Sequence, residues 1–233
     1  MWIIGDGGSP FRAPDNTLSS FQLAVSEWSD GVLVCVRKTS DAAFALSREG
    51  SVDVSGEKRT LGSISESEWT TLALTDSRTG QVYRPTPFST LLFWLSETPV
   101  RAFFEPLGSL AESREDCDAL IKIVESAKPK RSPSYILPPR FAAPSLPSES
   151  LWTFYPSRTE LPLPDGRKNV QAIGFASDLS KETVSGFSRV MLRDRAGFSE
   201  RTGLRFPGLW GIVTHSPYFA RKRYSPTPPG PRT

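Results

Sequence analysis

The chain has 233 residues, of which 38% are hydrophobic and 23% charged, and it contains 21 prolines. This composition is that of an ordinary folded protein of one or two domains, and it excludes a low-complexity or highly charged disordered chain. No run of about 18 apolar residues occurs, so no membrane-spanning helix is expected.

The net charge of +3 comes from the C-terminal end of the chain. Residues 216–233 contain four basic residues and no acidic residue, so the remainder is close to neutral. A nucleic-acid-binding domain usually has a basic face on the fold itself, and we therefore expect no nucleic-acid partner. The two cysteines, Cys35 and Cys117, form neither a disulfide framework nor a zinc motif. Because the N-terminus shows no signal-peptide pattern, a reducing cytoplasm is the expected location.

Apolar strand patterns alternate with helical periodicity over residues 2–128. Asn16 is expected to cap the first helix, and Ser65 to open a later one with a capping box. The expected strands are residues 2–5, 31–36, 43–46 and 101–105, and the expected helices begin near residues 16, 65, 87 and 113. Alternation of this kind indicates a parallel sheet whose two faces are covered.

The pattern becomes weaker after residue 129, where prolines recur. Strands are expected at residues 151–155, 170–175 and 209–214, with a helix over 181–189. We expect an α/β fold, a TIM-like (β/α)8 barrel that is lean or irregular in its second half, over residues 1–217. Its first and last strands should pair in parallel, because short βα connections leave these two to close the barrel. Residues 218–233 are basic and proline-rich and should form a disordered tail.

Residues 3–9 read Ile-Ile-Gly-Asp-Gly-Gly-Ser, and Pro-Asp-Asn-Thr follows at residues 14–17. This opening resembles the glycerophosphodiester phosphodiesterase family, which has a strand, His-Arg-Gly, a short loop, Pro-Glu-Asn-Thr and then a helix. The likeness continues at residues 30–36, 45–48, 61–72, 85–92, 103–107 and 208–217. There the family has, in order, a strand with Glu-x-Asp, a strand ending in His-Asp, two helices, a strand with Glu-x-Lys and a last strand with Thr-Asp-x-Pro. The resemblance implies the TIM-like barrel of the PLC-like phosphodiesterases.

The resemblance also implies a phosphoric diester hydrolase of lipid or glycerophosphodiester metabolism that uses two histidines and a divalent cation. Histidine suits proton transfer because its pKa lies near neutral pH, and a cation held by carboxylates offsets charge on the phosphoryl oxygens. Among the positions at which this sequence departs from that pattern are six of the family's functional residues. They are Asp6 and Ser47 in place of the histidines, Gly7 of the arginine, Leu33 and Cys35 of Glu-x-Asp, and Leu107 of the lysine.

Glu105 remains, and Asp15 stands in for the glutamate of Pro-Glu-Asn. The chain has one histidine, His215, so a two-histidine mechanism is impossible. We therefore predict a catalytically inactive barrel, a pseudoenzyme that acts as a binding or structural subunit without a cofactor. The alternatives are a divergent hydrolase with a rearranged site, which would need a divalent cation such as Mg or Ca, and an assembly protein that uses the barrel surface and the tail.

The degenerate pocket is expected at the C-terminal ends of the strands, where barrel enzymes place their sites. Its residues would be Asp6, Gly7, Asp15, Cys35, Ser47, Arg48, Glu105 and His215. Arg48 should lie against at least one of the carboxylates and neutralise it in place of a metal. A metal, if bound, would take Asp15 and Glu105 as ligands. The expected ligand is a phosphate- or glycerol-bearing molecule.

Two residues and the tail each allow a second interpretation. Cys35 is expected to be a small buried hydrophobe and not a nucleophile, because no histidine stands at a motif position to activate it. His215 is expected to be a loop residue that bonds a backbone carbonyl, with a role at the site as the alternative. The tail from Arg221 to Arg232 offers a protein partner an Arg-x-x-Pro-x-x-Pro pattern beginning at Arg223, although a solvated tail explains the same composition.

Overall fold

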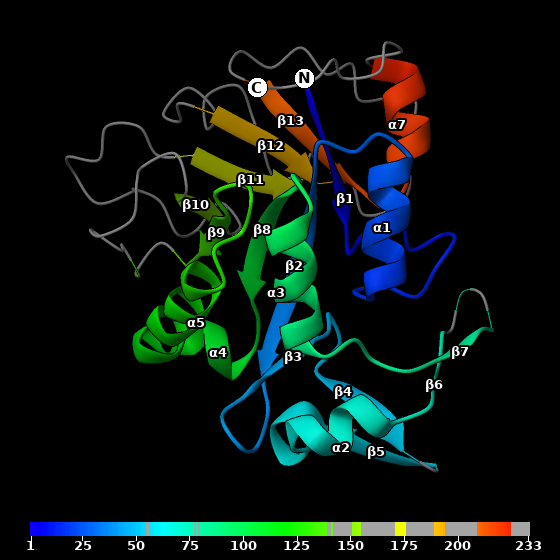
Figure 1. The fold of residues 1–233 in the computed structure, drawn as a ribbon, viewed down its shortest axis with the longest axis vertical. Helices are drawn as coiled ribbons and strands as arrows, with labels where there is room; N and C mark the ends of the chain where they lie inside the picture. The colour runs from blue at the N-terminus through cyan, green and yellow to red at the C-terminus, as the bar shows by residue number, and fades with distance from the viewer. Residues whose placement is uncertain are drawn as a thin grey trace.

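A computed structural model of the chain describes residues 1–54, 56–76, 78, 80–138, 141, 151–154, 171–175, 189–193 and 209–224. Within these residues, eight parallel strands form a closed ring (Figure 1). In the order of the ring they are β1 Trp2–Asp6, β2 Gly31–Lys38, β8 Arg101–Pro106, β9 Ser134–Leu137, β10 Leu151–Phe154, β11 Gln171–Phe175, β12 Arg189–Arg193 and β13 Leu209–Thr214. The predicted α/β barrel is confirmed.

Closure of the ring depends on the first and last strands. β13 lies beside β1 in parallel, with Ile3 opposite Ile212 and Ile4 opposite Val213. β1 pairs on its other side with β2, and the remaining strands continue the circuit back to β13. The predicted adjacency of these two strands is confirmed, so all eight strand ends point to one mouth of the barrel.

Helices pack on the outside of the first strands. They are α1 Leu18–Ser26, α3 Phe88–Glu97, α4 Ser109–Glu112 and α5 Arg114–Ser126. The N-cap of α1 is Thr17, whose side chain accepts a hydrogen bond from the Ser20 amide, and not Asn16 as expected. Asn16 instead adopts a φ of 55°, and its Oδ1 accepts a hydrogen bond from the Cys35 amide of β2. Because the Asn16 side chain is bonded to β2, it does not cap α1.

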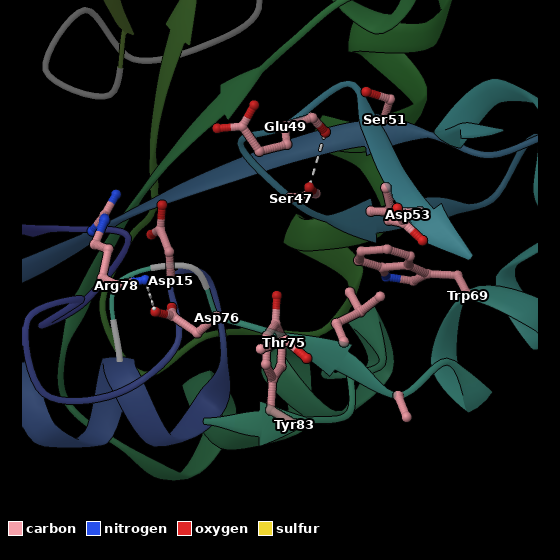
Figure 2. Close-up of a pocket in the computed structure, with 13 residues that line it drawn as sticks. Asp15, Ser47, Glu49, Ser51, Asp53, Trp69, Thr75, Asp76, Arg78 and Tyr83 are labelled. Carbon is pink, nitrogen blue, oxygen red and sulfur yellow. Dashed lines mark hydrogen bonds between the residues drawn. The ribbon is translucent and has the colours of Figure 1, made fainter. Parts of the chain in front are cut away.

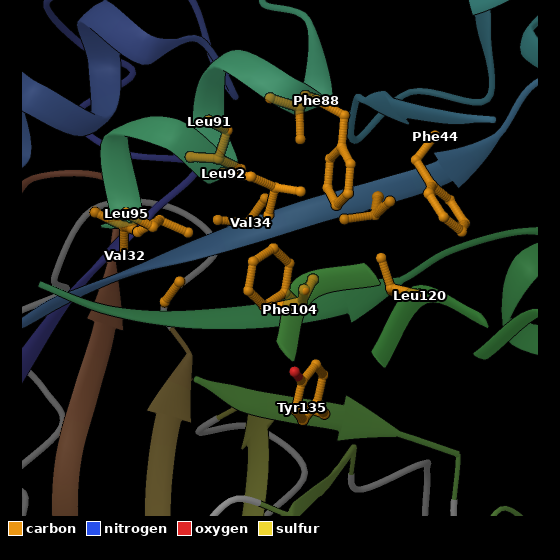
Figure 3. Close-up of a cluster of buried hydrophobic side chains, with 14 of the residues drawn as sticks. Val32, Val34, Phe44, Phe88, Leu91, Leu92, Leu95, Phe104, Leu120 and Tyr135 are labelled. Atoms are coloured by element: carbon orange, nitrogen blue, oxygen red, sulfur yellow. The ribbon is translucent and has the colours of Figure 1, made fainter. Parts of the chain in front are cut away.

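Two apolar clusters lie on opposite sides of the strands. Val34 and Phe104 point outward and meet Leu91 and other residues of α3 (Figure 3). The alternate residues of the same strands, with Ile4 and Trp152, point inward and fill the barrel. Because side chains alternate along a strand, Leu33 and Cys35 of β2 belong to this inner cluster.

A long excursion leaves the barrel between β2 and β8 and lies near the carboxyl ends of the strands (Figure 1). Its elements are β3 Phe44–Leu46, β4 Ser51–Val54, β5 Glu57–Thr60, the 3-10 turn Leu61–Ser63, α2 Glu66–Thr71, β6 Leu74–Thr75 and β7 Val82–Tyr83. The Ser65 side chain accepts a hydrogen bond from the Glu68 amide, which confirms the predicted start of α2. Ala45, Trp69 and Leu74 contribute to a small core of its own beneath these elements.

Sequence periodicity missed two strands of the barrel. β9 is only four residues long and lies between Pro133 and Pro138, so its apolar run was too short to read. β12 begins at Arg189, where the end of a helix was expected. The rest of that expected helix lies outside the described residues.

The start of the C-terminal tail is helical and belongs to the fold. α7, Pro217–Tyr224, packs against β1 and β13, and the expectation of disorder is wrong for this part of the tail. The Arg221 side chain is 1% exposed and its Nη2 donates to Asp30 Oδ2 at 2.7 Å and to the Trp28 carbonyl at 2.6 Å. A basic run in a sequence usually indicates solvent-exposed side chains, but the Arg221 guanidinium is buried with its partners. Residues 225–233 lie outside the described chain.

No helix in the described part of the chain combines the length and the apolar character that a membrane span requires.

Candidate functional site

Three carboxylates meet at the C-terminal mouth of the barrel. Asp6 is the last residue of β1, Glu105 lies near the end of β8, and Asp15 lies in the loop between β1 and α1. Asp6 and Glu105 are buried, and Asp15 is partly buried. The C-terminal ends of β1 and β8 bring Asp6 and Glu105 together, as expected from the sequence. Two buried carboxylates this close need a positive charge beside them.

Arg193, the last residue of β12, lies between the two buried carboxylates. Its Nε donates to Asp6 Oδ2 at 2.8 Å and its Nη2 to Asp6 Oδ1 at 3.0 Å. Its Nη1 donates to Glu105 Oε1 at 2.8 Å. The guanidinium is only 6% exposed. One side chain thus bridges both carboxylates through charge-assisted hydrogen bonds.

Arg48 follows β3 and completes the network from the solvent side. Its Nη2 donates to Asp6 Oδ1 at 2.5 Å and its Nε to Asp15 Oδ2 at 2.9 Å. The side chain is 22% exposed. The expectation that Arg48 contacts at least one carboxylate is therefore confirmed, and it contacts two.

Gly7 is the residue that allows this approach. It has a φ of +68°, and a Cβ built at this position would lie 1.5 Å from Asp15 Oδ1. A larger residue here would push Asp15 away from Arg48. Only glycine fits, because the position needs both a left-handed backbone and an empty space.

The two guanidinium groups control the charge of Asp6. Burial by itself would raise the pKa of Asp6, but Arg193 and Arg48 outweigh it and hold that pKa well below its usual range. Burial is the larger influence on Asp15, whose pKa is raised despite the contact with Arg48. Of Asp6 and Asp15, Asp6 is therefore the firmly ionised carboxylate.

Cys35 lies inside the barrel, with its Sγ donating to Glu105 Oε2 at 3.5 Å. Burial, the largest influence, raises the pKa of the Cys35 thiol well above its usual value. A protonated thiol is a poor nucleophile. The expectation that Cys35 acts as a small buried hydrophobe agrees with this position.

His215 follows β13 and faces Asp6. Its Nε2 lies 3.5 Å from Asp6 Oδ2, is buried, and has no hydrogen-bond partner among the described residues. The expected bond to a backbone carbonyl does not form there, because the ring points into the mouth. Burial lowers the pKa of His215 more than Asp6 raises it, which leaves the imidazole neutral at neutral pH.

The site residues predicted from the sequence do not all enter this network. Ser47 turns away, and its hydroxyl donates to the Glu49 carbonyl at 2.9 Å. Arg193 was missed, although an apolar run, Val190 to Leu192, ends in it and a charged residue directly after a buried strand was the available signal.

The residues at the mouth do not fit a divalent cation. Asp6 and Glu105 already accept hydrogen bonds from Arg193, and Asp15 accepts one from Arg48. The thiol of Cys35 is a poor ligand for a hard cation. Across the described ranges, no group of three His, Cys, Asp or Glu side chains is arranged to hold a metal ion. The guanidinium groups provide the positive charge in this arrangement.

A separate pocket lies between this network and the excursion (Figure 2). Its volume is about 520 Å³. Asp15 belongs both to the network and to the pocket, and Ser47 with residues of β4, α2, β6 and β7 forms the other walls. The pocket is thus built mainly by the excursion and not by the barrel strands.

No protein-family model matches the chain, and no curated protein matches it. Solved structures do. The structure of a phosphodiesterase from Oleispira antarctica, in complex with the product sn-glycerol-3-phosphate, has a TM-score of 0.73 and 16% identity, covering 95% of this chain and 96% of that one. A glycerophosphodiester phosphodiesterase from Thermotoga maritima has a TM-score of 0.68 and 15% identity, covering 95% and 97%. One from Agrobacterium tumefaciens has a TM-score of 0.62 and 13% identity, covering 94% and 97%.

Identity this low establishes the fold and nothing finer. The chain has the barrel fold of glycerophosphodiester phosphodiesterase structures over nearly its whole length. The fold that the sequence resemblance implied is confirmed.

Proposed function

We propose that this chain is a glycerophosphodiester phosphodiesterase-like protein that has lost the family's activity and acts as a binding or structural subunit. The observation that carries the proposal is Arg193, whose guanidinium lies between Asp6 and Glu105. A buried arginine cannot give up its proton, so it replaces the charge of a metal without replacing its chemistry.

The remaining residues at the mouth support the same proposal. Hydrolysis of a phosphodiester needs a proton acceptor, a proton donor and positive charge aimed at the phosphoryl oxygens. Asp6 is held ionised by two arginines and is a weak base. The thiol of Cys35 is buried and protonated. Arg193 directs its donors at carboxylates, so they are not available to a substrate.

The ligand in this proposal is a phosphate- or glycerol-bearing molecule. The similar structure from Oleispira antarctica contains sn-glycerol-3-phosphate. In this chain, Arg48 is the guanidinium of the network that is partly open to solvent, and it would supply the contact to a phosphate. A cytoplasmic location is part of the proposal because Cys35 and Cys117 are both free thiols.

The experiment is a hydrolysis assay of the purified protein on glycerophosphodiesters with added magnesium, calcium or manganese. One of the structurally similar phosphodiesterases serves as the positive control. We expect no turnover above background, since the general acid, the general base and two metal ligands of the family are absent together. Turnover that the Glu105→Gln variant abolishes would overturn the proposal.

A divergent hydrolase is the second candidate, and one observation favours it. The His215 imidazole is neutral and lies at the mouth with its Nε2 unpaired among the described residues, as a general base must be. If the assay shows turnover, His215→Asn should abolish it while leaving the fold intact. Turnover that survives this change would exclude His215 as the base.

A further inference from the structure

Exposed aromatic side chains gather where the barrel mouth meets the start of α7. Among the side chains that the structure describes, five aromatic ones are exposed, and they are those of Phe11, Trp28, Phe93, Tyr218 and Phe219. Three of these belong to α7 or to the loop between β1 and α1 beside it. A single exposed aromatic residue is ordinary, but several on one surface indicate an interaction site.

Ring contacts connect these three residues. The ring of Phe11 lies edge-on to that of His215, two residues before α7, with 6.3 Å between the ring centroids. Tyr218 and Phe219 lie in the first turn of α7, with 5.5 Å between their centroids. The group therefore borders the mouth and continues onto the outside of α7. We call it, with the exposed basic residues beside it, the α7 face: Phe11, Arg12, Tyr218, Phe219 and Lys222.

The exposed charges of the α7 face are positive. Arg12 is 63% exposed, and its partner Glu27 is buried. Lys222 is exposed, whereas Asp30, the acidic residue bonded to α7, is buried. Residues 216–233 contain four basic residues and no acidic residue, so they carry all of the net positive charge of the chain. A negatively charged partner therefore suits this surface.

α7 presents this face to solvent because its other side is anchored to the barrel. Ala220 and Tyr224 pack against β1 and β13, and the buried Arg221 is paired with Asp30. Phe219, in contrast, is 70% exposed. An apolar side chain held in water on a fixed helix gains free energy when a partner covers it. The α7 face is thus a preformed surface that needs no rearrangement to bind.

We propose that the α7 face docks on the surface of an anionic membrane. The three aromatic rings would lie among the lipid head groups, with the two basic side chains against acidic ones. A protein partner fits less well, because lysine is depleted from the cores of protein interfaces, and the Lys222 ammonium lies within the face, 4.5 Å from the centroid of the Tyr218 ring. Docking of this kind goes beyond the proposed function and does not depend on what the mouth binds.

Vesicle co-sedimentation of the full chain tests the docking. The probes are vesicles of phosphatidylcholine alone and vesicles in which about a third of the lipid is phosphatidylserine, which carries a negative charge. We expect binding to the anionic vesicles to be at least about tenfold tighter than to the neutral ones, and to weaken as salt screens the charges. Equal binding to both kinds of vesicle, or no binding to the anionic ones, would contradict the proposal.

Two matched pairs of variants test the residues. Phe219→Ser should weaken binding to anionic vesicles about tenfold, whereas Phe93→Ser, at an equally exposed phenylalanine on α3, should leave it unchanged. Lys222→Glu should weaken binding by a similar factor, whereas Lys58→Glu makes the same change of net charge on β5 and should have little effect. If the two members of each pair behave alike, the α7 face is not the docking surface. Melting temperatures show whether any loss of binding reflects a loss of folding.

Tryptophan substitutions show which surface meets the lipid. Brominated lipid should quench the fluorescence of Phe219→Trp more than that of Phe93→Trp, which has the same number of tryptophans but adds one on α3. Equal quenching would mean that another surface contacts the membrane. Sedimentation velocity measures the oligomeric state of the same variants. A dimer that Phe219→Ser dissociates, in a protein that does not bind vesicles, would assign the α7 face to contact between copies of the chain and overturn the proposal.

Discussion

Arg193 holds Asp6 by two hydrogen bonds, from Nε to Oδ2 at 2.8 Å and from Nη2 to Oδ1 at 3.0 Å. The two residues are 187 positions apart in the sequence. They meet because β12 and β1 both flank β13, so their C-terminal ends lie on the same part of the mouth. Closure of the barrel and neutralisation of its buried carboxylates are therefore achieved by the same strands.

Arg193→Ala should destabilise the protein by about 3–5 kcal/mol, because it leaves Asp6 and Glu105 buried without their shared partner. Chemical denaturation measures this change in the free energy of unfolding. Arg114→Ala, which removes an exposed arginine paired with an exposed Asp118, is the matched control and should change little. A small effect at Arg193 would show that the carboxylates are neutralised in some other way.

Arg48→Ala should destabilise by about 3 kcal/mol, less than the change at Arg193, since Asp6 keeps its other partner. The comparison is with Arg84→Ala, which changes an exposed arginine. The same denaturation experiment applies. Equal values for Arg48 and Arg84 would mean that the Arg48 contacts contribute nothing to stability.

The pH dependence of stability should have two opposing parts. The pKa of Asp6 is lowered in the folded state. The stability that Asp6 contributes is therefore fully present above the usual carboxyl pKa of about 4, and it is lost as the pH falls toward the lowered pKa. The pKa of Asp15 is raised, so acidification favours its folded state. The free energy of unfolding is measured by denaturation between neutral and acidic pH. On acidification it should fall less steeply in Asp6→Asn, and more steeply in Asp15→Asn, than in the unchanged protein. Slopes of the opposite sign would contradict these assignments.

Gly7→Ala should destabilise more than Gly56→Ala. Both residues have a positive φ, so both changes incur about 1 kcal/mol of backbone strain. At Gly56 nothing lies within 4 Å of the added Cβ, whereas at Gly7 the Cβ would overlap Asp15 and break its contact with Arg48. Melting temperatures of the two variants isolate this second contribution. A similar loss in both would leave backbone strain as the whole effect.

Arg221→Ala should destabilise by about 3–5 kcal/mol, because Asp30 would remain buried without its charge partner. The neighbouring change, Lys222→Ala, affects an exposed side chain and should have little effect. Thermal unfolding of the two variants compares them directly. If both behave alike, α7 is not fastened to the barrel through this pair.

The sequence by itself determined the architecture of the first half, and its single histidine excludes a mechanism that needs two. Strand and helix periods are local, so β1, β2 and β8 could be read from a few consecutive residues. Because parallel strands send their C-terminal ends to one side, the meeting of Asp6 with Glu105 and the contact of Arg48 with a carboxylate also followed from strand order.

The tertiary structure alone decided which partners complete the network and the pocket. Arg193 and Arg221 contact residues from the opposite end of the chain, at positions set by ring closure and strand register. Trp69 and Asp53 come to line one pocket because the excursion folds over the mouth. Local periodicity contains no information on such contacts, since they depend on the three-dimensional path of the whole chain.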